Sequence, residues 1–486
     1  MKKIFFILSL VASCAFTKEV KINIDEAISL ALDNNGLNKI SRINLEIAQA
    51  QYEQALSANY PSLNAIFYAN RNNQDTIFEQ RGTFTLSPEF TKTLALANTL
   101  NMPSGVARDT AQSQIAATPI SAFPTGSISA DIDTKAMGRD TVRGTLELNY
   151  ALYTGGKIDA IINQAKLNKE LVKASITRSE NDVTFDVKRY YYGYILTNEL
   201  YEIVNKIYRN MELSTILAKE FMENSTTLKI NRTDYLNAKL TTFLIQSTLS
   251  KIELNREMLK NAIANLIGLK WDDTVSISYD EDEILNQNIP LQKMIQKSYE
   301  LNPDISKINL AVKIKDEQIK ESKSAYYPQV GVFGNVNKTY NSYEYGYLSE
   351  DNQNTWNIGI AVKMSLFDGF RTTNSVIEKK LNKKVIDEQK ILLEEGLALQ
   401  LKNEFLTSSM GYKQIQILKD AVETASENSE LNLKGFQYEM IEAKDLIQSQ
   451  LTEAYVKADY LKYVHDYLVS LSKIDNLVGK KIDENF

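Results

Sequence analysis

Stretches in which apolar and polar residues alternate recur along the chain. The clearest covers residues 355–368, where one side of the alternation is entirely apolar: Trp356, Ile358, Ile360, Val362, Met364 and Leu366. A period of two predicts a β-strand with one apolar and one polar face. Similar stretches predict strands at 60–72, 143–154 and 327–339. Such strands suit either a membrane β-barrel or an amphipathic sheet on a soluble core.

A different pattern predicts very long helices. Residues 157–223 and 371–435 contain almost no Pro or Gly, and apolar residues in the first of them recur at intervals of three and four. This is the period of an amphipathic helix. At 1.5 Å per residue such helices are roughly 100 Å long, so they need coiled-coil partners. The predicted partners are residues 232–268 and 441–475, completed by helices over 24–58 and 304–324.

The two halves of the chain carry the same landmarks in the same order. LNKISRINL at 37–45 matches LNPDISKINL, and YALYTGGK matches MSLFDGFR. Tyr-Pro steps open the first strand of each half, and NLIGL and NLVGK close the halves. We therefore predict two tandem repeats, one over residues 16–268 and one over 301–478. Residues 269–300 are the linker between them, and residues 479–486 are a short C-terminal tail.

The sequence GGK in the first half does not fit a phosphate-binding loop. That loop needs Gly five residues before its second Gly and Ser or Thr after the Lys. This chain has Ala151 and Ile158 at those places. We predict instead a tight corner where a strand passes into a long helix, formed by Gly155 and Gly156 and, in the second half, by Gly369.

Composition narrows the range of functions. The net charge is −6 and the pI about 5.3, which makes nucleic acid an unsuitable partner. The chain has one His, His465, and one Cys, Cys14. One residue of each type cannot build a His/Cys metal site, a redox pair or a disulfide. We therefore expect neither an enzyme nor a cofactor.

The N-terminus has the features of an export signal. MKKIFFILSLVASCAF begins with two lysines after Met1, continues with a short apolar run and ends in small residues. This is the pattern of a secretory signal peptide. Two processing routes stay open. Cleavage after Ala15 removes residues 1–15, whereas a lipobox at VASC removes 1–13 and leaves Cys14 acylated.

Four aromatic residues strengthen the membrane interpretation of the strands. They lie where predicted strands meet helices: Tyr60, Tyr153, Tyr327 and Phe367. Aromatic girdles occupy such a rim in membrane barrels. Four strands cannot close a barrel, and an open edge in lipid leaves backbone groups unpaired. If the strands lie in a membrane, several chains share one barrel, and three chains give twelve strands.

Together, the signal peptide, the tandem halves, the paired strands and the Gly corners resemble the TolC family of bacterial outer-membrane efflux proteins. The resemblance implies a mixed α/β membrane protein. Three chains, with four strands each, form a twelve-stranded outer-membrane β-barrel that continues as a long periplasmic α-helical barrel. The homotrimer is a passive exit duct of a tripartite efflux system. Its implied partners are outer-membrane lipid, a periplasmic adaptor (membrane fusion protein) and an inner-membrane RND, ABC or MFS transporter.

The resemblance also assigns roles to residues at the helix-hairpin tips. Adaptor contacts fall at the second tip on Glu439, Met440 and Ile441, where the family usually has a Gly-containing turn. At the longer first tip they fall on Thr227, Leu228 and Lys229. The periplasmic entrance and its selectivity are assigned to Asp445 and Gln448 and, in the first half, to Asp234 and Asn237. Three copies of Asp445 around an axis attract cations.

One segment and two other functions stay open. Residues 73–142 are far longer than a strand connection needs; as an external loop they cover the barrel mouth, contact a surface partner or are largely disordered. Within the same architecture, the chain is alternatively the outer channel of a type I protein-secretion system. From a different class, it is a coiled-coil structural or adhesive surface protein whose strands form a small soluble sheet.

Overall fold

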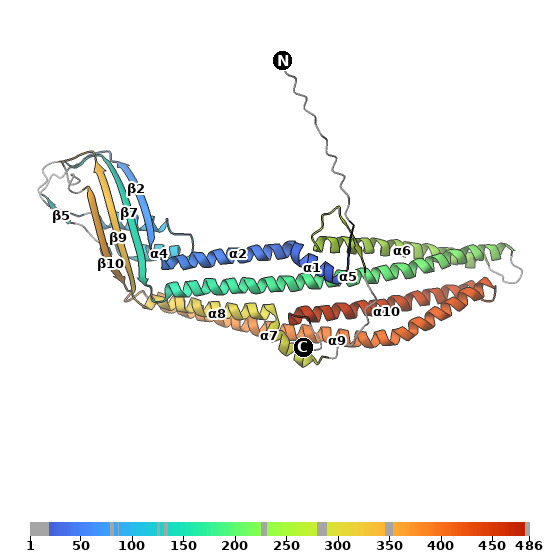
Figure 1. Cartoon of the computed structure of the whole chain (residues 1–486). Coiled ribbons are helices and arrows are strands. Elements are labelled where there is room, and N and C mark those ends of the chain that lie inside the picture. The colour runs from blue at the N-terminus through green and yellow to red at the C-terminus, as the bar shows by residue number, and fades with distance from the viewer. Residues whose placement is uncertain are drawn as a thin grey trace, which may run out of the picture. The chain divides into compact units, whose positions relative to one another are not determined.

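The fold contains both long helices and β-strands (Figure 1). The computed structural model describes residues 19–77, 82–85, 87–123, 127–130, 135–224, 231–278, 289–345 and 353–481. The chain divides into two compact units. Unit 1 comprises residues 1–50, 166–314 and 382–486, and unit 2 comprises residues 51–165 and 315–381. Among the described residues, none of the helices is both long and apolar enough to cross a membrane.

Unit 1 consists mainly of helices. Its elements, some of which extend into unit 2, are β1 (Glu19–Ile22), α1 (Ile24–Asn34), α2 (Gly36–Leu56), α5 (Lys157–Asn224), α6 (Arg232–Leu266), β8 (Thr274–Ile277), α7 (Leu291–Leu301), α8 (Pro303–Lys323), α9 (Arg371–Gln437) and α10 (Ala443–Val478). The segment expected as a linker, 269–300, contains β8 and all of α7 except its last residue, Leu301. β8 pairs in parallel with β1.

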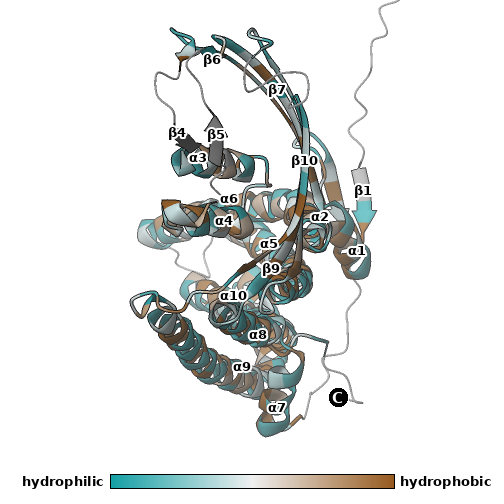
Figure 2. Ribbon diagram, turned by 90° about the vertical axis from the view of Figure 1, so that its left-hand side faces the viewer, coloured by the Kyte–Doolittle hydropathy of each residue, from teal (hydrophilic) through white to brown (hydrophobic). Residues whose placement is uncertain are grey.

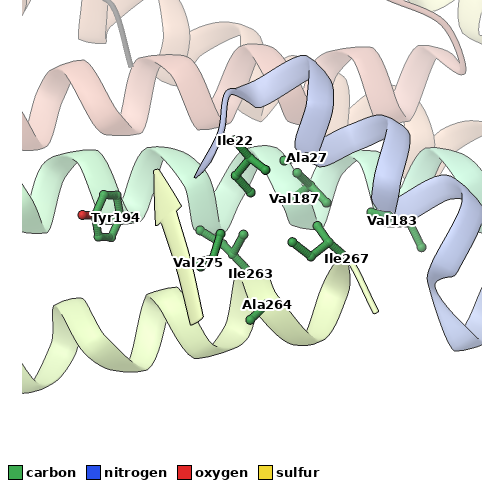
Figure 3. Close-up of a cluster of buried hydrophobic side chains, with 10 residues drawn as sticks. Ile22, Ala27, Val183, Val187, Tyr194, Ile263, Ala264, Ile267 and Val275 are labelled. Atoms are coloured by element: carbon green, nitrogen blue, oxygen red, sulfur yellow. The ribbon is translucent and has the colours of Figure 1, made fainter. Parts of the chain in front are cut away.

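Separate apolar clusters hold unit 1 together. In one of them β1, α1, α5, α6 and β8 pack side chains against one another (Figure 3). Its most buried members include Ile22, Val187 and Ile263, each at most 1% exposed. A second cluster joins α7, α8, α9 and α10 through residues such as Met294, Leu401 and Ile474. Burying apolar side chains between amphipathic helices stabilises helices that are not stable alone.

Two buried asparagines fix the entry of the helices α2 and α8. Asn302 Oδ1 accepts the Asp304 backbone N–H at 2.8 Å, and its Nδ2 donates to the carbonyl of Leu477 at 2.7 Å. Asn35 makes the same pair of bonds, to the Leu37 N–H at 2.9 Å and to the carbonyl of Leu266 at 3.2 Å. Each side chain therefore caps one helix start and ties it to the end of another helix.

The asparagine at position 35 also explains a difference from the expected helix over 24–58. The chain forms α1 and α2 instead, followed by a 3-10 turn at Ser57–Asn59. Asn35 has φ −59° and ψ 133°, which is outside the helical region. Because the Asn35 side chain accepts a hydrogen bond from a following backbone N–H, one helix ends before Asn35 and the next begins after it.

Unit 2 contains an antiparallel sheet in the order β10-β9-β7-β2. Its strands are β2 (Ser62–Arg71), β7 (Asp140–Tyr153), β9 (Gln329–Asn341) and β10 (Asn354–Lys363). The strand expected at 355–368 is shorter, because β10 ends opposite Gln329. Residue 328 is Pro, which has no N–H to extend the ladder.

The segment expected as one external loop, 73–142, contains regular structure. Its described elements are β3 (Thr76–Ile77), β4 (Gly82–Thr85), α3 (Pro88–Thr99), α4 (Val106–Ala117), a 3-10 turn (Ile120–Ala122), β5 (Ser127–Ala130), β6 (Lys135–Met137) and the start of β7. Ser87 accepts the Glu89 N–H and caps α3, whose first residue is Pro88. Pro and a capping Ser favour a helix start here.

We predict that Asn302→Ala lowers the free energy of unfolding of unit 1 by about 1–3 kcal/mol, because it removes a helix cap and leaves a buried carbonyl without its donor. Thermal unfolding of the detergent-solubilised protein measures this. Asn265→Ala, at an exposed position in the last turn of α6, is the matched control and should shift the midpoint much less. Equal shifts for the two variants would contradict the role of Asn302.

Candidate functional site

One face of the four-stranded sheet is apolar and exposed. Register partners lie on the same face, and one such row crosses all four strands: Ala65, Leu146, Val336 and Trp356. Leu146, Val336 and Trp356 are 52%, 58% and 74% exposed. Ile358 and Ile360 continue the face along β10 at 70% and 68%. Soluble proteins rarely expose a continuous apolar surface of this kind, so it marks an interaction site.

The other face of the sheet is polar, and its side chains bond across the strands. Thr145 Oγ1 and Asn337 Oδ1 lie 2.7 Å apart, and Arg143 Nε donates to Thr339 Oγ1 at 3.0 Å. Asn337 in turn donates to Asn335 at 2.9 Å. The sheet therefore has one apolar face and one polar face.

Both edges of this sheet are without a neighbouring strand among the described residues. β2 and β10 stand at the two ends of the strand order, each with one neighbour. An edge strand presents unpaired N–H and C=O groups. The described part of the sheet thus combines one exposed apolar face with two edge strands.

The four aromatic residues predicted as a girdle occupy the end of the sheet where strands meet helices. Tyr60 and Tyr327 precede β2 and β9, Tyr153 ends β7, and Phe367 follows β10. Their exposed fractions run from 47% for Tyr153 to 77% for Phe367. Phe367 also contacts Phe370 edge to face, with ring centroids 5.6 Å apart. The girdle role stays a prediction.

The two predicted corners have closely similar geometry. Gly155 and Gly156 have φ of +67° and +83°, and Gly369 and Phe370 both have φ of +66°. Before the first pair, Thr154 Oγ1 accepts the Ile158 N–H at 3.2 Å and caps α5. Each corner thus needs two consecutive left-handed residues before its helix starts.

In the second corner, Asp368 Oδ2 accepts the Thr372 N–H at 3.0 Å. Asp368 therefore caps its helix as Thr154 does in the first corner. Hydrogen bonds from Thr372, opposed by slight desolvation, lower the pKa of Asp368. The left-handed Phe370 was missed from the sequence, although its alignment with Gly156 was a signal for it. A Cβ on Gly155 would lie 2.7 Å from the Ser324 carbonyl oxygen, whereas one on Gly369 meets no atom within 4 Å.

The second tip is a tight turn at the end of α9. The Met440 N–H donates to the Gly435 carbonyl at 2.8 Å, and the Glu439 N–H to the Phe436 carbonyl at 3.0 Å. These two bonds define a Schellman motif, which needs a left-handed residue before its last position. Glu439 fills that position with φ +58°. Glu439 therefore adopts the backbone conformation that Gly adopts most readily. Ile441 follows and packs against Gly435.

Below this turn the ends of the long helices of unit 1 share an apolar cluster. Phe436 of α9 is fully buried together with Leu446 of α10 and Met211 of α5, and Ile245 of α6 joins them. Phe221 packs against Phe436, with ring centroids 5.7 Å apart. The cluster fixes the end of α9 relative to the start of α10. Thr227, Leu228 and Lys229 of the first tip lie outside the described residues.

The predicted entrance residues lie in the first turns of α10 and α6. Asp445 and Gln448 are exposed near the start of α10. Asp234 has a structural task as well, because it forms a capping box with Asn231: its Oδ2 accepts the Asn231 N–H at 3.1 Å. Asn237 is exposed one turn later. The entrance role of these four residues stays a prediction.

A buried carboxylate farther along α10 was not anticipated. Glu453 is 4% exposed and bonds to Lys457 Nζ at 2.6 Å. Burial raises its pKa, but hydrogen bonds from Lys457 and Ser429 and the charges of Lys457 and Lys206 outweigh burial and leave the pKa lowered. Its contribution to stability is therefore present at neutral pH and is lost as the pH falls through the lowered pKa.

Within the described ranges, no cluster of three or more His, Cys, Asp or Glu side chains is placed to hold a metal ion. The prominent features are instead the two-faced sheet and the exposed helix ends.

A comparison with known protein families identifies a match in the C-terminal part of the chain. Residues 294–480 match the model of the outer membrane efflux protein family. No curated protein matches the sequence. The resemblance predicted from the sequence landmarks is thus confirmed over that segment.

Solved structures extend the likeness to nearly the whole chain at the level of the fold. The outer membrane protein VceC from Vibrio cholerae is 15% identical, with a TM-score of 0.69 over 95% of this chain and 97% of that one. CusC, described in terms of transmembrane channel formation, is 12% identical with a TM-score of 0.71 over 94% and 92%. The Campylobacter jejuni CmeC outer membrane channel is 14% identical with a TM-score of 0.67 over 95% and 87%.

We predict that Glu439→Gly stabilises the second tip by about 0.5–1 kcal/mol, because it relieves a left-handed side chain. Hydrogen exchange of the Met440 amide, whose bond to Gly435 closes the turn, should slow. Gln437→Gly, placed within the last turn of α9, is the matched control and should speed the same exchange. Faster exchange in Glu439→Gly would show that its side-chain interactions outweigh the backbone strain.

Proposed function

We infer that the whole chain is the outer-membrane exit duct of a tripartite efflux system, because residues 294–480 match the outer membrane efflux protein family. It conducts small molecules passively to the exterior from an inner-membrane RND, ABC or MFS pump and a periplasmic adaptor. The observation that carries the proposal is the two-faced sheet. Its apolar face fits lipid, and its polar face fits a water-filled lumen.

Lipid explains why the apolar face has no cover within the chain. A soluble coiled-coil protein would bury Leu146, Val336 and Trp356 against its own core, yet each is more than half exposed. In a bilayer these side chains are in their preferred environment. The aromatic residues at the strand–helix end, such as Tyr60 and Phe367, then lie near the periplasmic membrane interface.

The open edges support a trimer. Lipid offers no hydrogen bonds to the N–H and C=O groups of β2 and β10, so both edges need a strand from another chain. Joining β2 of one chain to β10 of the next closes a ring, and three copies give a twelve-stranded barrel. A head-to-tail contact that closes in this way produces cyclic symmetry.

Exposed apolar side chains on the long helices support the same assembly. On α9 within unit 1, Leu392, Leu399 and Met410 are 67%, 60% and 63% exposed. On α6, Leu240 and Leu244 are 57% and 60% exposed. Neighbouring copies cover these side chains in a continuous helical barrel across the periplasm.

The helix ends of unit 1 take two roles in this proposal. The turn at Glu439, Met440 and Ile441, together with Thr227, Leu228 and Lys229 of the first tip, docks the adaptor. Asp445 and Gln448, with Asp234 and Asn237, line the entrance. Three copies of the exposed Asp445 make a negative ring that favours cations.

Deletion of the gene should raise susceptibility to several drugs or metal ions, and the wild-type gene should restore resistance. A susceptibility panel measured together with protein secretion tests this. Unchanged susceptibility with loss of a secreted protein would contradict efflux and support the type I secretion channel. Recovery of the protein as a detergent-independent soluble rod would contradict any membrane duct.

Asp445→Ala should weaken the cation preference of the trimer in planar bilayers or raise its conductance, because the negative ring at the entrance is lost. Reversal potentials under a salt gradient report the selectivity. Glu442→Ala, which removes another exposed carboxylate just before α10, is the control and should change the selectivity less. Unchanged selectivity and conductance in Asp445→Ala would remove this role.

A further inference from the structure

The long insertion between β2 and β7 contains a helical hairpin with its own fastening. α3 and α4 are joined by a turn at residues 100–105. Lys92 of α3 donates to the carbonyls of Ala116 and Thr118, at 2.8 and 3.2 Å, at the end of α4. An ammonium group suits the unpaired carbonyls at a helix C-terminus. The two helices therefore form one antiparallel unit.

This hairpin is docked on the sheet at two separate points. Near the turn, the Asn98 side chain donates to Glu147 of β7. At the other end, Lys363 Nζ of β10 donates to the Gln114 carbonyl at 3.3 Å and to Thr118 Oγ1 at 3.4 Å. Since β9 separates β7 from β10, the hairpin crosses β9.

Both docking points are on the polar face. Glu147 is the register partner of Asn335, and Asn335 is the partner of Asn357, so all three share a face. Lys363 lies an even number of residues after Asn357 on β10 and faces the same way. The sheet is curved, and α3 lies on its concave side (Figure 2).

We propose that the α3–α4 hairpin is a plug inside the duct, which narrows the barrel lumen and must be displaced for export. The proposal rests on the proposed function, because the polar face becomes the lumen only in the barrel. It accounts for the length of the insertion between β2 and β7, since a connection that only turned the chain would need a few residues.

The dimensions favour a closed lumen. Twelve strands at ordinary spacing and tilt enclose a barrel roughly 25 Å across between backbones. A helix with its side chains is about 10 Å wide, so a hairpin of two helices is roughly 20 Å across. The hairpins therefore take up most of the lumen, and a solute can pass only after they move.

The contact between the α3–α4 hairpin and the sheet has features that favour its release. The hydrogen bonds between hairpin and sheet come from two side chains, Asn98 and Lys363. At the first docking point, Asn98 Oδ1 is buried and has no hydrogen-bond partner among the described residues. Buried groups without partners weaken a contact, and water can replace polar bonds when the hairpin leaves.

Single-channel conductance of the purified full-length trimer tests the plug. In the variant, residues 88–118 are replaced by a short Gly/Ser linker. We expect its conductance to be several-fold higher than that of the wild type. A trimeric channel of unchanged conductance would overturn the plug and leave the duct intact. No conductance in either protein would overturn both.

A point variant serves as a check if the deletion disturbs assembly. Lys363→Met removes one docking point and should raise conductance or the frequency of large openings. Arg143→Met removes one positive charge from the same face, where the arginine bonds to Thr339 rather than to the hairpin, and is the matched control. Equal changes in the two variants would indicate a charge effect and overturn the docking role.

Cross-linking tests the location directly. With the single native cysteine, Cys14, replaced, Asn98→Cys and Glu147→Cys should be joined by a short bifunctional thiol reagent. The joined channel should stay at its low conductance. Asn98→Cys with Leu148→Cys is the matched control, because Leu148 lies on the opposite face. Failure of the first pair to join, or joining of the control pair, would overturn the plug.

Discussion

Unsatisfied backbone hydrogen bonds at the two edges of a small sheet are the constraint on which the rest of this structure depends. The four strands bury few apolar side chains of their own, and the face containing Leu146 and Trp356 is open. In water, exposure of that apolar face is unfavourable. In lipid, the unpaired N–H and C=O groups of the open edges are unfavourable. Sharing one barrel among several chains is the arrangement that satisfies both. In the proposed trimer, neighbouring copies also cover the exposed apolar side chains on α6 and α9.

The join between strand and helix shows how one physical requirement is met by different residues. Each corner needs a capping oxygen followed by two left-handed residues. The first uses Thr154, Gly155 and Gly156, and the second uses Asp368, Gly369 and Phe370. Only Gly155 also lies against neighbouring backbone, close to Ser324. The constraint is therefore tighter at one corner than at the other, although both have the same backbone path.

Some features were accessible from sequence because they depend on local periodicity. The alternation along 355–362 indicates which side chains of β10 share a face, and the intervals of three and four along α5 indicate a helix. The family resemblance came from the order of short landmarks and is confirmed over residues 294–480. These signals need no knowledge of distant contacts.

Other features depend on contacts that no local pattern encodes. The end of β10 is set by Pro328, just before the neighbouring strand β9, and the break at Asn35 by a side chain that also reaches Leu266. The left-handed Glu439 has no glycine to signal it. The docking of Asn98 and Lys363 joins residues far apart in the chain. The alternation in the sequence did predict that Glu147 and Lys363 lie on the polar faces of their strands. It did not predict that the α3–α4 hairpin contacts them.

The most direct measurement of the central claim compares charges placed on the two faces of one strand. Ile358 and Asn357 are adjacent on β10, and Ile358 is on the apolar face at 70% exposure. A lysine facing lipid near the middle of a bilayer costs about 2–4 kcal/mol per chain, whereas a lysine in the lumen costs little. Ile358→Lys should therefore reduce trimer assembly in outer-membrane fractions while Asn357→Lys assembles normally. Equal assembly of the two variants would contradict a lipid-facing sheet.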